Sequence, residues 1–219
     1  MTTLKVHGHP RSSNTRRVLL VLKEKEIPYE LIQSEWSAAE HTEPAWLEAH
    51  PFGLMPYLDD NGFKVFESRA IARYLVAAYP AKGPALVPAA SAGAKALAAF
   101  EQAAAVEAST FNPLLEGILH ERFVKPFQGG TTDETVVAPL ITLLEEKLPG
   151  YERILSKTKY LAGDEITLAD LFHIPLLNFF VPARLDMLTN EDKAKKWPHV
   201  VKWAEELLAR ESTKATAVQ

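Results

Sequence analysis

Hydrophobic and polar positions in the first 80 or so residues alternate between the periods of strands and helices. The stretch 3–8 (TLKVHG) predicts a short strand. The apolar residues of 16–26 (RRVLLVLKEKE) recur at helical spacing, and 28–33 (PYELIQ) is extended again. This order of periods predicts a β-α-β unit.

Three further elements follow before residue 80. The stretch 42–50 (TEPAWLEAH) predicts a short helix, with Thr42 placed to cap it and a proline in its first turn. Residues 60–62 (DNG) separate two runs of mixed polarity and predict a hairpin, and 68–79 predicts a helix that starts at Ser68. The full order, β-α-β-α-β-β-α, predicts one small α/β domain over residues 1–80.

The composition changes after this domain. Residues 81–90 are rich in Pro, Gly and Ala without periodicity, which predicts a linker. Beyond it, residues 91–219 carry helical periods and almost no strand signals, which predicts an all-α C-terminal domain. Its expected features are a long helix bent near Asn112-Pro113, a helix over about 132–155, a helix announced by the capping-box pair Thr167 and Asp170, an amphipathic helix over 197–210 and a loose tail at 211–219.

Charge and composition exclude several classes of protein. The chain has 219 residues, 47% of them hydrophobic, enough for a sizeable core, and its formal net charge is -4 without any block of Lys and Arg. Nucleic acid is therefore not an expected partner. The absence of cysteine excludes disulfides, thiolate zinc sites and a cysteine nucleophile. With no secretory leader and no apolar run of about 18 residues, a cytoplasmic location is expected.

Two short motifs carry candidate chemistry. Proline at the start of a strand, as in Met55-Pro56, suits a cis peptide bond that turns the Met55 backbone towards an extended peptide. Glu67 and Ser68 stand at a helix start, where backbone N–H groups bind a carboxylate and an acidic side chain accepts from an ammonium. Taken singly, these residues fit an edge-strand proline, a solvated charge and a helix cap. Together they favour a site for a small peptide zwitterion.

The stretches 8–22 (GHPRSSNTRRVLLVL), 40–60 (EHTEPAWLEAHPFGLMPYLDD) and 63–75 (FKVFESRAIARYL) resemble the phi class of the cytosolic glutathione transferases, and 166–171 (ITLADL) resembles its helical part. The resemblance covers nearly the whole chain. It implies a thioredoxin-like N-terminal domain, an all-α C-terminal domain, glutathione as co-substrate and a homodimer, with Phe52 as the candidate for insertion into the partner.

The resemblance also assigns roles by position. Ser12 matches the serine that activates the glutathione thiol, His41 a contact to the glycine end, and Met55 a backbone contact to the cysteinyl residue. Glu67 and Ser68 match the γ-glutamyl site. Position 54 belongs to the same glutathione site, but Leu54 stands where glutamine is common, and Thr42 stands where lysine is common; both changes remove polar contacts.

Ser12, Ser13 and Asn14 can each cap the first helix, so the sequence leaves capping and chemistry as alternatives at Ser12, with Ser13 as the second candidate for the catalytic role. Serine is no base near neutral pH, but its hydroxyl can donate a hydrogen bond to a thiolate beside a helix N-terminus. Activation of the thiol alone raises the reaction rate only a few-fold, because the nucleophilicity of the thiolate falls as its basicity falls. Holding the electrophile near the sulfur must supply the rest.

An apolar pocket over Ser12, built by the helical domain, is therefore expected. The candidates to line this electrophile pocket are Trp36, Leu115, Leu119, Phe123 and Phe179, although core packing is the favoured interpretation of each one taken singly. His120 and His173 are interpreted as packing or surface histidines, and no metal site is expected.

These features predict conjugation of glutathione to small apolar electrophiles, with peroxidase activity as a possible side reaction. Two alternatives remain: a non-catalytic carrier of apolar molecules, favoured by the residues at 42 and 54, and an interaction module of the translation-factor accessory type, which the retained Ser12, Glu67 and Ser68 disfavour.

Overall fold

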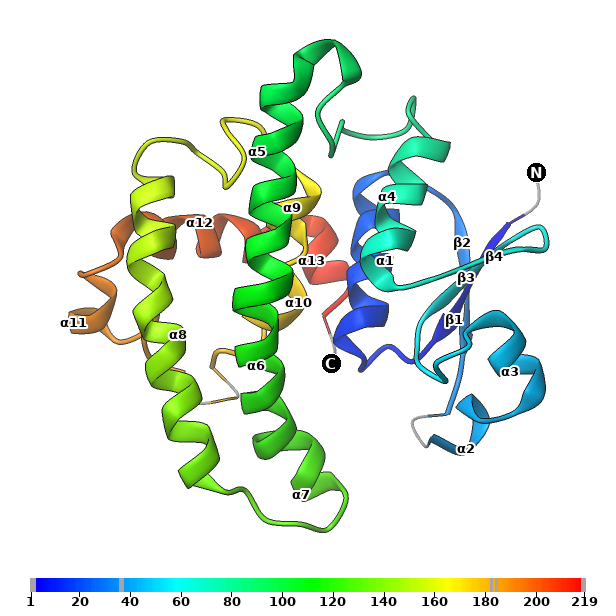
Figure 1. Cartoon of the computed structure of the whole chain (residues 1–219), viewed down its shortest axis with the longest axis horizontal. Coiled ribbons are helices and arrows are strands. Elements are labelled where there is room, and N and C mark those ends of the chain that lie inside the picture. Colours follow the sequence, from blue (N-terminus) through cyan, green and yellow to red (C-terminus); the bar gives the residue numbers. More distant parts are fainter. Residues whose placement is uncertain (1–2, 36–37, 182, 184, 218–219) are drawn as a thin grey trace. The chain divides into compact units, whose positions relative to one another are not determined.

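The computed structural model describes residues 3–35, 38–181, 183 and 185–217 (Figure 1). The chain divides into two compact units. The first comprises Met1–Val87 together with Glu211–Gln219, and the second comprises Pro88–Arg210. Each unit has its own buried core, so each is described by itself.

The first unit is built on a four-stranded sheet in the order β2-β1-β3-β4. Its strands are β1 (Leu4–Gly8), β2 (Tyr29–Gln33), β3 (Tyr57–Asp60) and β4 (Phe63–Phe66). β1 pairs in parallel with β2 and antiparallel with β3, and β3 pairs antiparallel with β4. Both central residues of the β3-β4 turn, Asn61 (φ 55°) and Gly62 (φ 94°), have positive φ, which is the backbone that a two-residue hairpin requires. The predicted hairpin is confirmed.

Helices cover both faces of this sheet (Figure 1). α1 (Ser13–Glu24) packs against α4 (Ser68–Ala78), and their apolar faces bury Val18 and Leu22 of α1 with Ile71 and Leu75 of α4. Two short helices, α2 (Ala38–His41) and α3 (Pro44–Ala49), lie towards the other face. The predicted thioredoxin-like order of elements is confirmed, with α2 as an additional turn that the sequence pattern did not predict.

The predicted cap of the short helix is wrong. The N-cap of α3 is Glu43, whose side chain makes no capping hydrogen bond, and Pro44 occupies the first turn as expected. Thr42 instead directly follows α2, and its hydroxyl donates to the carbonyl of Ala39 at 2.8 Å. Threonine hydroxyls can bond a carbonyl three or four residues earlier as well as cap a following helix, and here the backward bond is the one that forms.

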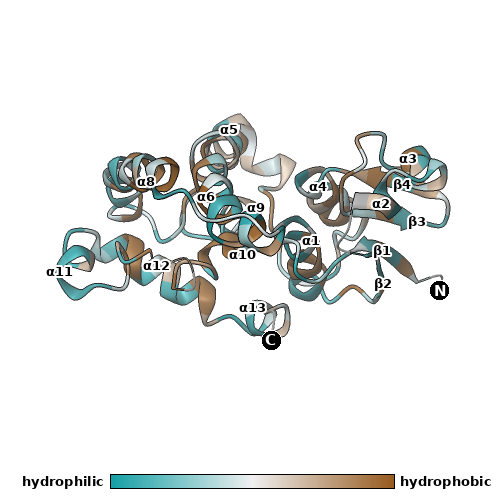
Figure 2. Cartoon of the chain, turned by 90° about the horizontal axis from the view of Figure 1, so that it is seen from below, coloured by the Kyte–Doolittle hydropathy of each residue, from teal (hydrophilic) through white to brown (hydrophobic). Residues whose placement is uncertain are grey.

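The second unit is helical, as predicted. Its elements are η1 (Ala90–Ala92), α5 (Gly93–Val106), η2 (Glu107–Phe111), α6 (Asn112–Leu119), η3 (His120–Val124), α7 (Lys125–Phe127), α8 (Glu134–Leu155), α9 (Leu168–Leu171), α10 (Ile174–Leu177), α11 (Glu191–Ala194) and α12 (Pro198–Leu208). The irregularity expected near Asn112-Pro113 takes the form of a π-helical turn, η2, directly before the proline. Figure 2 shows hydrophobic and hydrophilic residues interspersed along α8 and α12, as in amphipathic helices.

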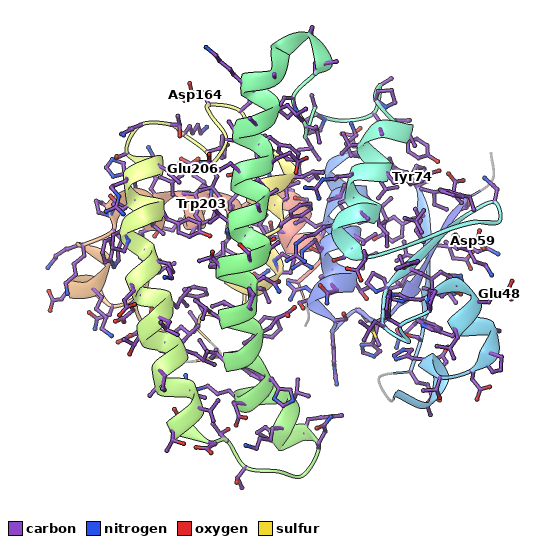
Figure 3. The ribbon with its side chains drawn as sticks, viewed as in Figure 1. Glu48, Asp59, Tyr74, Asp164, Trp203 and Glu206 are labelled. Atoms are coloured by element: carbon purple, nitrogen blue, oxygen red, sulfur yellow. The ribbon has the colours of Figure 1, made fainter. Side chains whose placement is uncertain are left out.

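The capping box of α9 is confirmed and is the centre of a buried polar network. Asp170, which has no exposed surface, accepts from the Thr167 backbone N–H and from the Leu161 backbone N–H, each at 3.0 Å. The indole of Trp203 on α12 (Figure 3) donates to the same carboxylate at 3.0 Å. His173 is also buried, with one ring nitrogen 2.8 Å from the Ala169 carbonyl and the other 3.0 Å from the Tyr151 hydroxyl. It is a packing histidine, as interpreted.

Within the segment expected to be a loose tail, residues 211–216 instead pack against the rest of the first unit. Residues Glu211–Ala215 form α13, which packs on α1. Arg16 donates from Nε to the carbonyl of Thr216 at 2.9 Å, and Ser212 hydrogen-bonds Glu24. The pattern of residues 211–219 is too short to reveal this packing, because its partners lie about 200 residues earlier in the chain.

Candidate active site

Ser12 lies at the start of α1 and caps it. Its backbone is extended (φ -69°, ψ 124°), and its hydroxyl oxygen accepts from the Thr15 backbone N–H at 3.3 Å. A serine hydroxyl accepts through its lone pairs and donates through its hydrogen, so the cap leaves the donor available. Capping and chemistry at Ser12 are therefore compatible, and not alternatives. Ser13 is the first residue of the helix and does not cap it.

Gly8 brings three segments of the site together. A Cβ atom at Gly8 would lie 2.5 Å from Oγ1 of Thr15 and 3.2 Å from Cβ of Pro56. Glycine therefore allows the end of β1 to contact both the first turn of α1 and the residue that opens β3. This close approach places Pro56 beside the helix that Ser12 caps.

The Met55-Pro56 peptide bond is cis, as predicted. In the antiparallel ladder between β1 and β3, Tyr57 is the first residue of β3 that pairs, and its partner is His7. Met55 precedes Tyr57 by two residues and therefore lies outside the ladder. Its backbone groups are thus placed outside the sheet ladder, at a point where an extended peptide can pair with them.

Glu67 and Ser68 form the start of α4. Glu67 is the N-cap but makes no capping hydrogen bond through its side chain, and its backbone has φ 68°, a conformation that non-glycine residues adopt at a cost. The N-cap residue therefore supplies no side-chain acceptor to the first turn of α4, and the N–H groups at a helix N-terminus are groups that bind a carboxylate. Glu67 is exposed, whereas Ser68 is buried.

Arg17 joins the starts of α1 and α4. Its guanidinium has no exposed surface, and Nη1 donates to Oγ of Ser68 at 2.9 Å and also to Oδ1 of Asn14. Two helix N-termini and a buried cation thus meet in one region, where they favour an anion. The sequence motifs did not indicate Arg17. A signal was present, because a charged residue interrupts the apolar face of α1.

His41 ends α2 and is buried against α3. Its ring lies 4.6 Å from the Trp46 ring, and among the described residues Nε2 has no hydrogen-bond partner. Burial lowers the pKa of His41, against the opposing effect of Glu40, so the ring is neutral at neutral pH. The same part of the site includes Leu54, whose side chain is 56% exposed and whose carbonyl accepts from the Trp46 indole at 3.0 Å.

The residues expected to line the electrophile pocket differ in exposure. Trp36 lies outside the described residues. Leu115 and Leu119 are buried within the second unit, as core residues are. Phe123 and Phe179 are partly exposed, and their ring centroids are 5.6 Å apart, so they form one aromatic pair that a ligand can reach.

Within the described ranges, histidine, aspartate and glutamate side chains form no group of three or more that could hold a metal ion. Those ranges also contain no helix with the length and apolarity of a membrane span.

Residues 2–77 match the family model for the glutathione S-transferase N-terminal domain, and residues 111–211 match the model for the C-terminal domain. Glutathione S-transferase PM239X14 of Arabidopsis thaliana is 42% identical over 199 residues, which cover 90% of each chain.

Two solved structures share the fold and cover nearly the whole chain. Glutathione transferase F7 from Populus trichocarpa has a TM-score of 0.87 and 34% identity, covering 98% of this chain and 97% of its own. Glutathione S-transferase I from mais, solved in complex with an atrazine glutathione conjugate, has a TM-score of 0.86 and 32% identity, covering 98% and 96%.

The chain belongs to the glutathione S-transferase family. The predicted phi-class resemblance is confirmed by full-length relatives of that class, among them F7 of Arabidopsis thaliana at 37% identity. The chain is thus a transferase that uses glutathione as its co-substrate.

Proposed function

We propose that the chain conjugates glutathione to small apolar electrophiles and that Ser12 is its catalytic residue. In this proposal the Ser12 hydroxyl donates to the glutathione thiolate, while His41 contacts the glycine carboxylate. The Met55 backbone pairs with the cysteinyl residue, and Glu67 and Ser68 bind the γ-glutamyl group. The observation that supports this most is the convergence of the Ser12 cap, the cis Met55-Pro56 bond and the open N-terminus of α4.

The reaction needs no base on the protein at Ser12. The thiol loses its proton to solvent, the thiolate forms a bond to the electrophilic carbon, and the leaving group departs with the electron pair of the broken bond. The hydroxyl and the N-terminus of α1 stabilise the thiolate. A pKa lowered from ~8.5 to ~6.5 corresponds to roughly 2.7 kcal/mol and raises the thiolate fraction at pH 7 about twenty-five-fold.

The electrophile is proposed to contact Phe123 and Phe179, the reachable pair among the predicted pocket residues. An apolar pocket holds an apolar electrophile without donating hydrogen bonds to it, so activity should extend over several electrophiles of similar size. Reduction of organic hydroperoxides by the same thiolate is the proposed side activity.

The proposal is tested with a chlorodinitrobenzene-type electrophile. The wild type is expected to form the conjugate, Ser12→Ala to lose the activity and Ser13→Ala to keep most of it. Glutathione at a hundred times its dissociation constant should also stabilise the fold by about 2.7 kcal/mol in thermal unfolding. An inactive wild type that binds apolar dyes tightly would contradict the proposal and favour a carrier.

We also propose a homodimer and a cytoplasmic location, both of which family membership supports. Phe52 is 72% exposed, so its own chain does not bury it, although its ring centroid lies 6.1 Å from that of Phe66 and 6.4 Å from that of His50. An exposed aromatic of this kind fits insertion into a second copy. Sedimentation should show a dimer for the wild type and a weakened one for Phe52→Ala, and an unchanged dimer would contradict the role of Phe52.

A further inference from the structure

Trp46 on α3 contacts both sides of the cis peptide bond. Its indole Nε1–H donates to the carbonyl of Leu54, the residue before Met55, at 3.0 Å. Its ring meets the ring of Tyr57, the residue after Pro56, edge-on at 5.0 Å. The side chain itself is buried, with 6% exposure.

We infer that Trp46 is a positioning residue for glutathione, holding the Met55 backbone and the His41 ring in their binding geometry. The inference rests on the proposed function, because it assigns a role within that glutathione site. It adds a residue that the sequence motifs did not indicate.

The segment 51–54 needs such an anchor because most of its side chains face solvent, whereas His50 directly before it is buried against Phe66. Pro51, Phe52 and Leu54 are exposed, so packing of these side chains within the chain cannot fix the path of the backbone. Trp46 holds both ends of the segment instead. Its carbonyl accepts from the His50 N–H at 2.8 Å, and its indole donates to the Leu54 carbonyl.

The same side chain supports His41. The two rings are 4.6 Å apart, and Nε2 of His41 is buried without a partner among the described residues. A buried polar atom without a partner costs free energy, which binding of a ligand can recover. The ring of Trp46 fixes the plane of the imidazole and therefore the direction in which Nε2 points.

The substitution Trp46→Phe separates the hydrogen bond to Leu54 from the ring contact with His41, because phenylalanine keeps an aromatic ring at the position and removes the indole donor. In Trp46→Phe the Leu54 carbonyl loses its hydrogen-bond donor, and the Met55 backbone gains conformational freedom. Binding of glutathione must then restrict this freedom, which costs free energy. The KM for glutathione should rise roughly threefold to tenfold, which is the range expected for one lost hydrogen bond. Because Ser12 is unchanged, kcat at saturating glutathione and the midpoint of its pH profile should stay at wild-type values.

Trp203→Phe is the matched control. Trp203 (Figure 3) is also a buried indole, and it also donates to an oxygen at 3.0 Å, but within the second unit. Loss of this hydrogen bond in Trp203→Phe should lower the stability of the fold and leave the KM for glutathione unchanged. An unchanged KM in Trp46→Phe, or an equal rise in Trp203→Phe, would overturn the inference.

Two readouts stand apart from catalysis. Amide hydrogen exchange in peptides that span residues 50–57 should be faster in Trp46→Phe than in the wild type, and unchanged in Trp203→Phe. If Trp46→Phe does not fold, the indole N–H signals of the 15N-labelled wild type replace it: added glutathione should shift the Trp46 signal and leave that of Trp203 in place. A wild type that binds no glutathione refutes the proposed function, whereas binding without a shift at Trp46 refutes only this inference.

Discussion

Three substitutions at Ser12 separate its two expected contributions, the cap of α1 and the hydrogen bond to the thiolate. Ser12→Thr keeps both the accepting oxygen and the donating hydrogen. Ser12→Asp keeps a good capping acceptor, but its ionised carboxylate cannot donate and repels a thiolate. Ser12→Ala removes both. Stability and thiol ionisation should therefore change independently across this series.

The contribution to stability follows from the geometry of the cap. Removal of a capping serine costs ~0.5–2 kcal/mol, and the Thr15 N–H lies 3.3 Å from the hydroxyl oxygen, at the long end of such bonds. A loss in the lower half of that range, about 0.5–1 kcal/mol, is therefore expected for Ser12→Ala. In a chain of this size that corresponds to a fall in Tm of roughly 1–4 °C. Ser12→Asp and Ser12→Thr should unfold close to the wild-type temperature.

The contribution to ionisation is larger. A hydrogen bond to a charged group is worth ~1.5–3 kcal/mol, which equals about one to two pKa units. Ser12→Ala should raise the pKa of bound glutathione by that amount, and Ser12→Asp by more. The rate at pH 7 is a weaker measure, because a two-unit rise in pKa also increases the nucleophilicity of the thiolate about eightfold and hides most of the loss.

The assay is therefore a direct titration of the glutathione complex by ultraviolet absorbance of the thiolate, paired with thermal unfolding of each variant. The wild type and Ser12→Thr should titrate well below free glutathione, and Ser12→Asp should titrate near or above it while remaining as stable as the wild type. Equal pKa values for the wild type and Ser12→Ala would refute the role of the hydroxyl, whatever the stability change.

Two further predictions concern stability. Gly83→Ala should destabilise more than Gly62→Ala in urea unfolding, because both positions have positive φ but only at Gly83 would the new Cβ clash, 2.4 Å from the Glu24 carbonyl oxygen, and an equal loss would contradict the clash. Burial lowers the pKa of His50, so near this pKa the folded chain binds fewer protons than the unfolded chain. The free energy of unfolding that depends on neutral His50 is therefore fully present above about pH 6.5 and is lost as the pH falls below it. His50→Asn should therefore lose less free energy of unfolding between about pH 7.5 and pH 5.5 than the wild type, and an equal loss would show that His50 does not contribute.

The sequence predicted the elements whose signals are local. Periodicity revealed α1, α4, α8 and α12, and the Asn61-Gly62 pair revealed the hairpin, because each signal lies within one element. It did not reveal α2, a single turn, or α13, which depends on Arg16 and Glu24 far away in the chain. The predicted domain boundaries and the electrophile pocket remain predictions.

The distinction between local signals and contacts over long sequence separations also holds within the candidate site. The cis bond at Pro56 and the open N-terminus of α4 follow from short motifs, and both were expected. The contact between Arg17 and Ser68 joins residues 51 positions apart, and it depends on how α1 packs on α4. Arg16 and Arg17 are both buried, and no local pattern reports that Arg17 contacts Ser68 while Arg16 contacts the Thr216 carbonyl, so this arrangement is found only in the folded chain.

The proposed function assigns binding and ionisation of glutathione to different elements of the first unit. In this proposal His41, the segment before Pro56 and the start of α4 hold the tripeptide, whereas the start of α1 acts on the sulfur. Gly8 and Arg17 connect these elements, since Gly8 allows the end of β1 to approach both Pro56 and Thr15 of α1, and Arg17 ties α1 to Ser68. Changes among the binding elements should therefore alter KM with little effect on the thiol pKa, and changes at Ser12 should do the reverse. Changes at Gly8 or Arg17 should alter both, because each of these residues sets the position of one group of elements relative to the other.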